Sequence, residues 1–348
     1  MIHIYSIDQA ELWDSIVRGF ANYDVYYLSG YAKAFQLHGD GDPHLLYYEA
    51  AGLKAIYVYM KRMTAIDGYF DSITPYGYGG VLFDHGVANP LELQEALATF
   101  WQTYTAKMRE EGIVDNFVRY HPVLRNAEGM RPLGNVIDLG KTIAMDLQSP
   151  DVNWENIISK NRNMIRKAQK NSIEIRHGKG MDLMDRFMEL YNATMKKNKA
   201  KAYYFFKRPF YESIDRDLHD NYEMFYAVYE GRPIAMSIMI FANGQMSYHL
   251  SGSDIQYRNL APSNLLLYKA ALWGCEQGFK TFHLGGGVGS GEDNLYKFKA
   301  AFNRNSDYQF SIGKEIFDQE KYDELVAERA GRDETFDKDS KFFPLYRT

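Results

Sequence analysis

The sequence predicts an α/β protein built from two similar domains, each a mixed, mostly antiparallel sheet flanked by helices. Two apolar runs that each contain a tight turn predict β-hairpins, at residues 45–60 around Gly52 and at residues 224–241 around Gly231. In both halves, a helical segment, a glycine and another apolar strand follow the hairpin. The same elements in the same order indicate a duplicated domain.

The helix after each hairpin ends at a glycine, because Gly112 and Gly278 stand where a helix C-terminus favours that residue. Further helices are expected over residues 154–171, 181–198 and 209–220, and at the start of the charged tail. A proline and turn-forming residues near residues 141–153 mark the join. We expect a first domain over residues 1–145, a second with the catalytic cleft over 146–316, and a C-terminal helix and tail over 317–348.

Charge and cysteine content narrow the classes of function. The 348 residues carry a formal net charge of −5, so any polyanion must bind to a local basic patch. The single cysteine, Cys275, excludes an internal disulfide and a cysteine-based zinc site, and no metal centre is expected. No signal peptide and no apolar run of membrane-spanning length is visible, which favours a cytoplasmic protein. The 28 tyrosines suit either a polar cleft or the packing of sheets.

A basic helix is expected just after the join. Lys160, Arg162 and Arg166 lie in a stretch without acidic residues, and the two arginines, four residues apart, share one helix face. Like charges at this spacing repel unless an anion lies between them, and arginine binds phosphate in a bidentate manner. The alternative is an ordinary solvated face.

A second acid-free stretch, residues 195–211, combines six basic residues with the aromatic run 203–206, which includes Tyr204. Basic side chains interleaved with aromatic ones are typical of surfaces that bind a looped or single-stranded nucleic acid. A lysine-rich loop whose aromatic residues belong to the core is the alternative. The two basic stretches together favour a polyanionic ligand near the second domain.

Two loops could carry binding residues. Residues 71–84 contain Tyr76, Gly77 and Tyr78 in a glycine-rich turn, where a ligand could approach the backbone; a plain turn is the alternative. In residues 245–270, a strand leads through a polar loop into a helix with Ser263 as its expected N-cap, and such a helix start favours anions.

The glycine-rich stretch at residues 283–303 is the most unusual feature. It lacks the pattern of a P-loop, and it misses the dinucleotide fingerprint because Ser290 stands at the third glycine position. We therefore interpret it as a strand that ends in a flexible turn, followed by a short element that presents Phe298 and Lys299.

Several of these motifs, in this order, resemble the Fem family of non-ribosomal peptidyltransferases, which are similar to tandem GNAT acyltransferase domains. They are "WENIISKNRNMIRKAQKNSIEI", "YEGRPIAMSIMI", "YHLSGSD" and "GFKTFHLGGG…NLYKFKAAFN". The resemblance covers about residues 150–310, and "TPYGYGG" supports it in the first half.

The resemblance implies transfer of an aminoacyl group from aminoacyl-tRNA to an amino group of a nucleotide- or lipid-linked peptidoglycan precursor. It places Lys299 at the reacting centre, where it would stabilise the oxyanion or hold a terminal phosphate of the tRNA. His249 and Tyr248 are the other candidate catalytic residues, although a lone histidine is more often structural. Candidate substrate-binding residues are Phe298, Arg162, Arg166, Lys160, Tyr76, Gly77, Tyr78, Tyr204, Ser251, Arg258, Asn264 and Gly286.

No cofactor is implied, no DNA is expected as a partner, and membrane contact would be peripheral at most. Two departures leave donor and acceptor open: residues 165–220 lack the long helical hairpin of some members, and Asn303 stands where a glycine is common. The alternatives are an acyl-CoA-dependent N-acyltransferase acting on an amino sugar or polysaccharide precursor, and a non-catalytic module that binds tRNA or glycan. Two features argue against ordinary CoA binding. The glycines of the usual pyrophosphate-binding loop do not follow Arg258, and Pro262 removes a backbone N–H donor.

Overall fold

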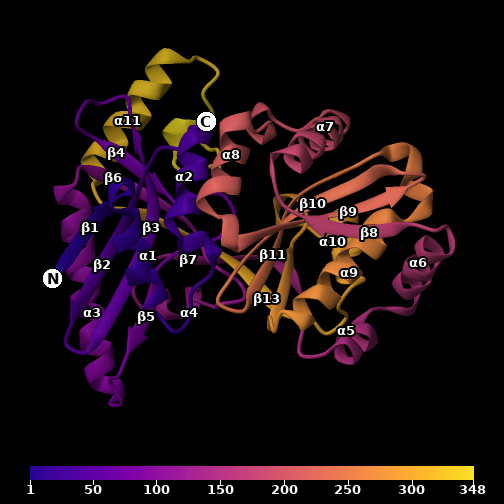
Figure 1. Cartoon of the computed structure of the whole chain (residues 1–348). Coiled ribbons are helices and arrows are strands. Elements are labelled where there is room, and N and C mark those ends of the chain that lie inside the picture. The colour runs from indigo at the N-terminus through magenta and orange to yellow at the C-terminus, as the bar shows by residue number, and fades with distance from the viewer. The chain divides into compact units, whose positions relative to one another are not determined.

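The computed structural model describes residues 1–348, which divide into two compact units (Figure 1). Unit 1 comprises residues 1–139 and 310–348, and unit 2 comprises residues 140–309. These bounds differ from the predicted ones. The expected boundary at 145/146 falls inside a strand, and the C-terminal helix and tail belong to unit 1.

Unit 1 contains a sheet in the order β1-β2-β3-β4-β6-β13, with β5 paired to β3. Its strands are β1 (Ile2–Ser6), β2 (Asp42–Ala50), β3 (Leu53–Met63), β4 (Phe70–Ile73), β5 (Leu82–His85), β6 (Ile113–Arg119) and β13 (Tyr308–Ile316), the last pairing with β6 through residues 312–316. Its helices are α1 (Ala10–Arg18), α2 (Ser29–His38), α3 (Pro90–Glu110), α4 (Ala127–Met130) and α11 (Gln319–Arg332).

The core of unit 1 lies between its sheet and α3 and is unusually aromatic. Tyr57, Phe100 and Tyr104 are fully buried or nearly so and meet edge-on or stacked. The hydroxyl groups of the two tyrosines are satisfied inside this layer by the side chain of Asn116, which accepts from Tyr57 and donates to Tyr104. Many of the tyrosines therefore pack the sheet, as one of the two sequence interpretations held.

Unit 2 contains a sheet in the order β7-β12-β11-β10-β9-β8. Its strands are β7 (Val136–Asp146), which pairs with β12 through residues 143–146, β8 (Glu174–Gly178), β9 (Tyr222–Tyr229), β10 (Arg232–Ala242), β11 (Gln245–Ser253) and β12 (Thr281–Gly285). Its helices are α5 (Pro150–Asn156), α6 (Ser159–Lys170), α7 (Met181–Lys197), α8 (Arg208–Asp217), α9 (Pro262–Glu276) and α10 (Asn294–Ala300).

The two sheets have the same order of strand pairings, although the sixth strand follows the others along the chain in unit 1 and precedes them in unit 2. In each, four strands pair antiparallel in succession, the next pair is parallel (β4–β6 and β11–β12), and the last pair is antiparallel. A helix, α3 or α9, connects the two parallel strands, as a parallel connection requires. The predicted duplication of a mixed, mostly antiparallel α/β domain is therefore confirmed.

The hairpin turns and helix ends also follow the sequence. Gly52, Gly231, Gly112 and Gly278 all have positive φ, from 70° to 77°, which glycine adopts without steric cost. In unit 2, α9 and α6 cover one face of the sheet and α7 covers the other (Figure 1). No helix of the chain has both the length and the apolar character needed to cross a bilayer.

Two local predictions are wrong. The single helix expected over residues 154–171 is two helices, because Ile157 and Ile158 are extended and Ile157 is fully buried in the core. The expected N-cap, Ser263, already lies inside α9. That helix begins at Pro262, whose missing N–H is no loss at the first position, and its N-cap is Ala261 in the left-handed conformation.

Candidate functional site in unit 2

The parallel pairing of β11 and β12 is short. It runs from Gln245 opposite Thr281 to Ser247 opposite His283, and then ends although β11 continues to Ser253. The pairing of β11 with β10 shifts register between Leu250 and Tyr248, so His249 occupies a bulge. The parallel pairing thus stops partway along β11 and near the carboxyl end of β12, so the two strands diverge from this point.

A turn that requires glycine leads out of β12 at this point. Gly285 and Gly289 have φ of 79° and 61°. A Cβ on Gly287 would lie 2.1 Å from the carbonyl oxygen of Gly291 and 2.5 Å from a carboxylate oxygen of Asp293. The glycines therefore let the chain fold tightly on itself and lead into α10, as the sequence analysis expected.

Lys299 lies in α10 and is 9% exposed. Its Nζ donates a hydrogen bond of 2.7 Å to the carbonyl oxygen of Gly286, so the turn itself holds the ammonium group. Burial lowers the pKa of Lys299 from its ordinary value to about 8, and the Asp293 carboxylate opposes that change. Lys299 is thus the one candidate catalytic residue that is buried and has a pKa near neutrality, which is typical of functional groups.

The elements around Lys299 are firmly fixed. Asp293 caps α10 by accepting a hydrogen bond of 2.9 Å from the N–H of Tyr296. Phe298 meets the buried Phe302 edge-on at 5.4 Å and packs against the core of unit 2. Just beyond, the side chain of Asn303 donates to the carbonyl of Ala144 at 2.7 Å, so the asparagine found in place of a glycine ties this segment to β7.

Sequence reasoning missed Asn161, which joins three helices of the site. It is 2% exposed, accepts a hydrogen bond of 2.7 Å from Asn264 at the start of α9, and donates one of 3.2 Å to the carbonyl of Ala301 directly after α10. The sequence did contain a signal for it. Asn161 lies at helical spacing from Ile165 and Ala168, so the three residues share the buried face of α6. An amide on an otherwise apolar helix stripe indicates a buried polar contact.

The basic face of α6 is present as predicted. Arg162 and Arg166 lie over the same ring, Trp154, at 5.9 and 5.3 Å from its centroid. Lys160 and Arg166 are exposed and Arg162 is half-buried. The stacking leaves donors of both guanidinium groups available to phosphate oxygens, because each group has five.

Tyr248 and His249 have environments that favour a structural role. Tyr248 packs against the unit 2 core and is hydrogen-bonded to Ser251 and Ser237, and burial raises its pKa. Burial lowers the pKa of His249 to about 3, so its imidazole is neutral at physiological pH. A catalytic role for either residue stays a prediction, as does substrate binding by Ser251.

The remaining candidates are dispersed. Arg258 is exposed in the turn before α9, and Gly286 contributes its carbonyl to Lys299. Tyr204 is half-buried in the loop between α7 and α8. The nearby lysines are all exposed, two at the end of α7 and three in the loop: Lys196, Lys197, Lys199, Lys201 and Lys207.

The tyrosine-rich loop belongs to unit 1 and is well packed there. Tyr31 donates to the carbonyl of Tyr76 at 2.6 Å, and Tyr78 meets Tyr26 edge-on. Gly77 has φ of 90°, and its Cβ would lie 2.6 Å from the ring of Tyr26. Packing within unit 1 is therefore sufficient to explain the residues of this loop, independently of any ligand.

Comparison with known proteins supports the GNAT assignment. Residues 159–299 match the model of the acetyltransferase (GNAT) domain. The sequence matches no curated protein. Among solved structures, FemX is similar with a TM-score of 0.68 at 13% identity, over 93% of this chain and 99% of FemX.

Two other solved structures are similar to this chain over most of its length. The C-terminal domain of a putative lysylphosphatidylglycerol synthetase from Agrobacterium fabrum gives a TM-score of 0.55 at 13% identity, over 88% of this chain and 91% of that one. L-PGS from Bacillus licheniformis gives 0.53 at 14% identity, over 94% and 97%. At these identities the likeness concerns the fold. Residues 159–299 of unit 2 are thus similar to a GNAT acetyltransferase domain, and the chain as a whole shares its fold with FemX.

Proposed function

We propose that this protein transfers an aminoacyl group from aminoacyl-tRNA to an amino group of a peptidoglycan precursor or a related cell-envelope acceptor. The observation that carries the proposal is Lys299, buried at the end of the glycine turn with its ammonium group on the Gly286 carbonyl. No cofactor is needed, because the ester of the donor is already activated.

In the reaction, the acceptor amine attacks the ester carbonyl, an amide bond forms, and the ester C–O bond breaks. The released tRNA hydroxyl gains a proton and the attacking nitrogen loses one. A negative charge develops on the carbonyl oxygen between these steps. A cation fixed in a partly dehydrated site stabilises that charge more than it stabilises the neutral ester, and this difference accelerates the reaction. We assign this role to Lys299, with holding of a donor phosphate as the alternative.

The basic face of α6 supports an RNA donor. Lys160, Arg162 and Arg166 lie on a helix with no acidic residue, and Asn161 of the same helix is bonded both to α9 and to the end of α10. A phosphate chain bound on this face would therefore lie on a helix that is rigidly connected to the segment carrying Lys299.

Acyl-CoA is the competing donor, and the start of α9 argues against it. Pyrophosphate binding at a helix N-terminus uses successive backbone N–H groups. Here Pro262 supplies none at the first position, and the N–H groups of Ala261 and Asn264 already bond within the turn, to Arg258 and Ala261.

The test is a titration of the purified protein with aminoacyl-tRNA and, separately, with acetyl-CoA, followed by a transfer assay with a precursor stem peptide. Lys299→Met is compared with Lys297→Met, which removes an exposed lysine from the same helix. We expect binding of the charged RNA by all three proteins and loss of transfer only in Lys299→Met. Saturable binding of acetyl-CoA without RNA binding would instead support the acyl-CoA-dependent enzyme. RNA binding without any transfer would support the non-catalytic module.

A further inference from the structure

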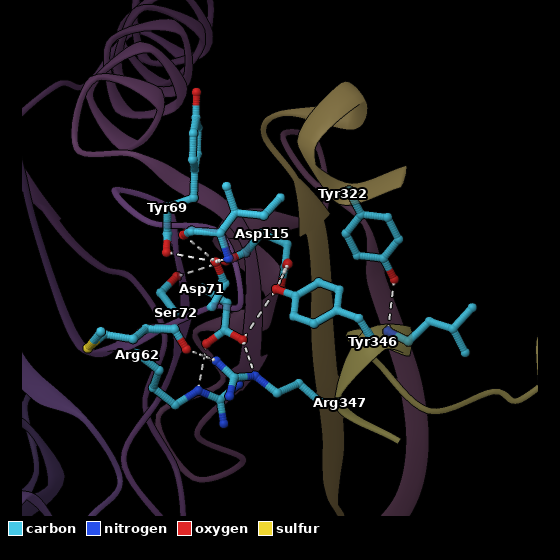
Figure 2. A network of polar contacts seen from close by, with 12 residues as sticks. Arg62, Tyr69, Asp71, Ser72, Asp115, Tyr322, Tyr346 and Arg347 are labelled. Atoms are coloured by element: carbon cyan, nitrogen blue, oxygen red, sulfur yellow. Dashed lines mark hydrogen bonds and ion pairs between the residues drawn. The ribbon is translucent and has the colours of Figure 1, made fainter. Parts of the chain in front are cut away.

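Two buried carboxylates lie side by side in the sheet of unit 1. Asp71 on β4 and Asp115 on β6 are register partners in the parallel pair, and both side chains are completely buried. The C-terminal segment reaches them, because the hydroxyl of Tyr346 donates to Asp115 at 2.5 Å and lies 3.3 Å from Asp71 (Figure 2).

The two acids are unequally neutralised. Asp71 is paired with two guanidinium groups, Arg62 at 2.6 Å and Arg347 at 2.7 Å. Asp115 touches no cation, and its Oδ1 has no hydrogen-bond partner. Burial raises the pKa of Asp115 to about 8; the charge of Asp71 adds to this effect, while Tyr346 and the two arginines oppose it. At neutral pH the acid pair therefore holds one proton.

The segment that closes over this pair contacts both β6 and α11, because Phe343, Leu345 and Tyr346 pack in an apolar cluster with residues of these two elements. Tyr322 of α11 accepts a hydrogen bond of 3.0 Å from the N–H of Leu345 and stacks on Phe343. Arg347 also donates to the carbonyl of Met63 at 2.6 Å. A pocket of about 140 Å³ that is partly open to solvent is lined in part by Tyr346 and Arg347, so water reaches one side of the segment.

We propose that residues 342–348 form a proton-operated latch, which is closed while the Asp71–Asp115 pair holds a proton and opens when the pair loses it. The groups that face the pair are Arg62 from β3, Tyr322 from α11, and Tyr346 and Arg347 from the latch itself. The two arginines remain charged at all relevant pH values, so the proton of Asp115 is the variable charge. The latch is independent of the function proposed for unit 2.

The direction of the effect follows from proton linkage. The closed state keeps the proton of Asp115 up to about pH 8, whereas in the open state the carboxyl group regains water and approaches its ordinary value of 3.8. The open state therefore binds fewer protons between these values, and rising pH favours opening. The ratio of open to closed molecules rises by about tenfold per pH unit in this window and becomes constant above it.

The test is hydrogen exchange of the full-length protein between pH 5 and 9, reported as protection factors for amides of residues 343–348. Protection factors remove the intrinsic pH dependence of exchange. We expect them to fall by about tenfold per pH unit and to level off near pH 8. Asp115→Asn should abolish the slope, because the amide stays neutral. Asp67→Asn, which removes an exposed acid from a neighbouring loop, should retain it.

A second variant keeps the proposal falsifiable if Asp115→Asn does not fold. Tyr346→Phe removes the hydrogen bond that lowers the pKa of Asp115, so the latch should be weaker at every pH and its levelling point should move above that of the wild type. Protection factors that do not depend on pH in the wild type would overturn the proposal. A slope that persists unchanged in Asp115→Asn would overturn it as well.

Discussion

Replacing Lys299 by methionine should increase stability while it abolishes transfer. Burial lowers the pKa of the lysine from 10.5 to about 8. This difference corresponds to a cost of about 3 kcal/mol for keeping the ammonium group charged in the folded state at pH 7. The methionine variant also loses the hydrogen bond to the Gly286 carbonyl, which offsets about 1 kcal/mol of the stability gained by removing the buried charge. We therefore expect Lys299→Met to be more stable than the wild type by about 2 kcal/mol at pH 7.

The stability difference between Lys299→Met and the wild type should also depend on pH. Between pH 8 and 10.5 the unfolded lysine still binds its proton, whereas the folded one has lost it. The wild type therefore gains stability with rising pH in this window, and the advantage of the methionine variant shrinks. Below pH 8 the advantage should be constant.

The assay is urea unfolding followed by tryptophan fluorescence, at pH 7 and at several values up to 10.5. Lys297→Met is the matched control because its side chain is exposed on the same helix, and its stability should stay within about 0.5 kcal/mol of the wild type at every pH. The reasoning is refuted if Lys299→Met is less stable than the wild type at pH 7, or if the difference does not change between pH 8 and 10.5. Gained stability with lost turnover would mark Lys299 as a residue retained for function.

Three further predictions concern the surroundings of the site and the first unit. Replacing Arg162 and Arg166 by glutamine should weaken binding of an RNA donor and reduce the slope of log affinity against log salt by about 1 to 2, measured by titration at several salt concentrations; an unchanged slope would exclude this face as the RNA contact. Gly77→Ala should lower stability by about 1–3 kcal/mol because its φ is 90° and its Cβ would meet a tyrosine ring; an unchanged melting temperature would contradict this. Asn161→Ala should cost about 1–3 kcal/mol, because the amide of Asn264 loses its partner and the carbonyl of Ala301 loses one of its two donors, whereas the exposed Asn163→Ala should cost less than about 0.5 kcal/mol; equal costs in chemical unfolding would disprove the difference.

The parts of the fold that the sequence predicted are those that local patterns determine. Hairpins around Gly52 and Gly231 need only an apolar run and a turn residue, and helices that stop at Gly112 and Gly278 need only a C-terminal glycine. Both signals lie within a few residues of the structure that they specify. The duplication could be inferred because these local signals recur in the same order.

The domain bounds could not be predicted, because they depend on pairing between distant segments. β13 follows almost the whole of unit 2 in the chain, yet it pairs with β6 of unit 1. The composition of residues 308–316 does not indicate which strand they pair with. The break at Ile157 has the same origin, since burial of that side chain in the core outweighs the helix propensity on either side.

The candidate site was predicted only in part, because burial and side-chain contacts also depend on distant segments. The position of Lys299 after a glycine turn follows from the sequence, but its burial and its bond to Gly286 depend on how the turn folds. The buried contacts of Asn161 depend on two other helices and were missed. Tyr76 and Tyr78 were assigned to ligand binding from their glycine-rich loop and from the resemblance, and the close packing of both rings is sufficient to explain them.

The two units differ in chemistry where their order of strand pairings is the same. In unit 1 the parallel pair β4–β6 carries polar side chains that bond to one another: Ser72 donates to Asn116 at 3.0 Å, and Asp71 is paired with two arginines. In unit 2 the equivalent pair contributes Met246 and Phe282 to an apolar core, and its buried His283 is hydrogen-bonded to Thr142 of β7. The polar groups of unit 1 are thus largely satisfied internally, whereas unit 2 presents one buried lysine held only by a backbone carbonyl. A carbonyl can release an ammonium group to a developing oxyanion at less cost than a carboxylate can, and this difference favours unit 2 as the unit that performs the transfer.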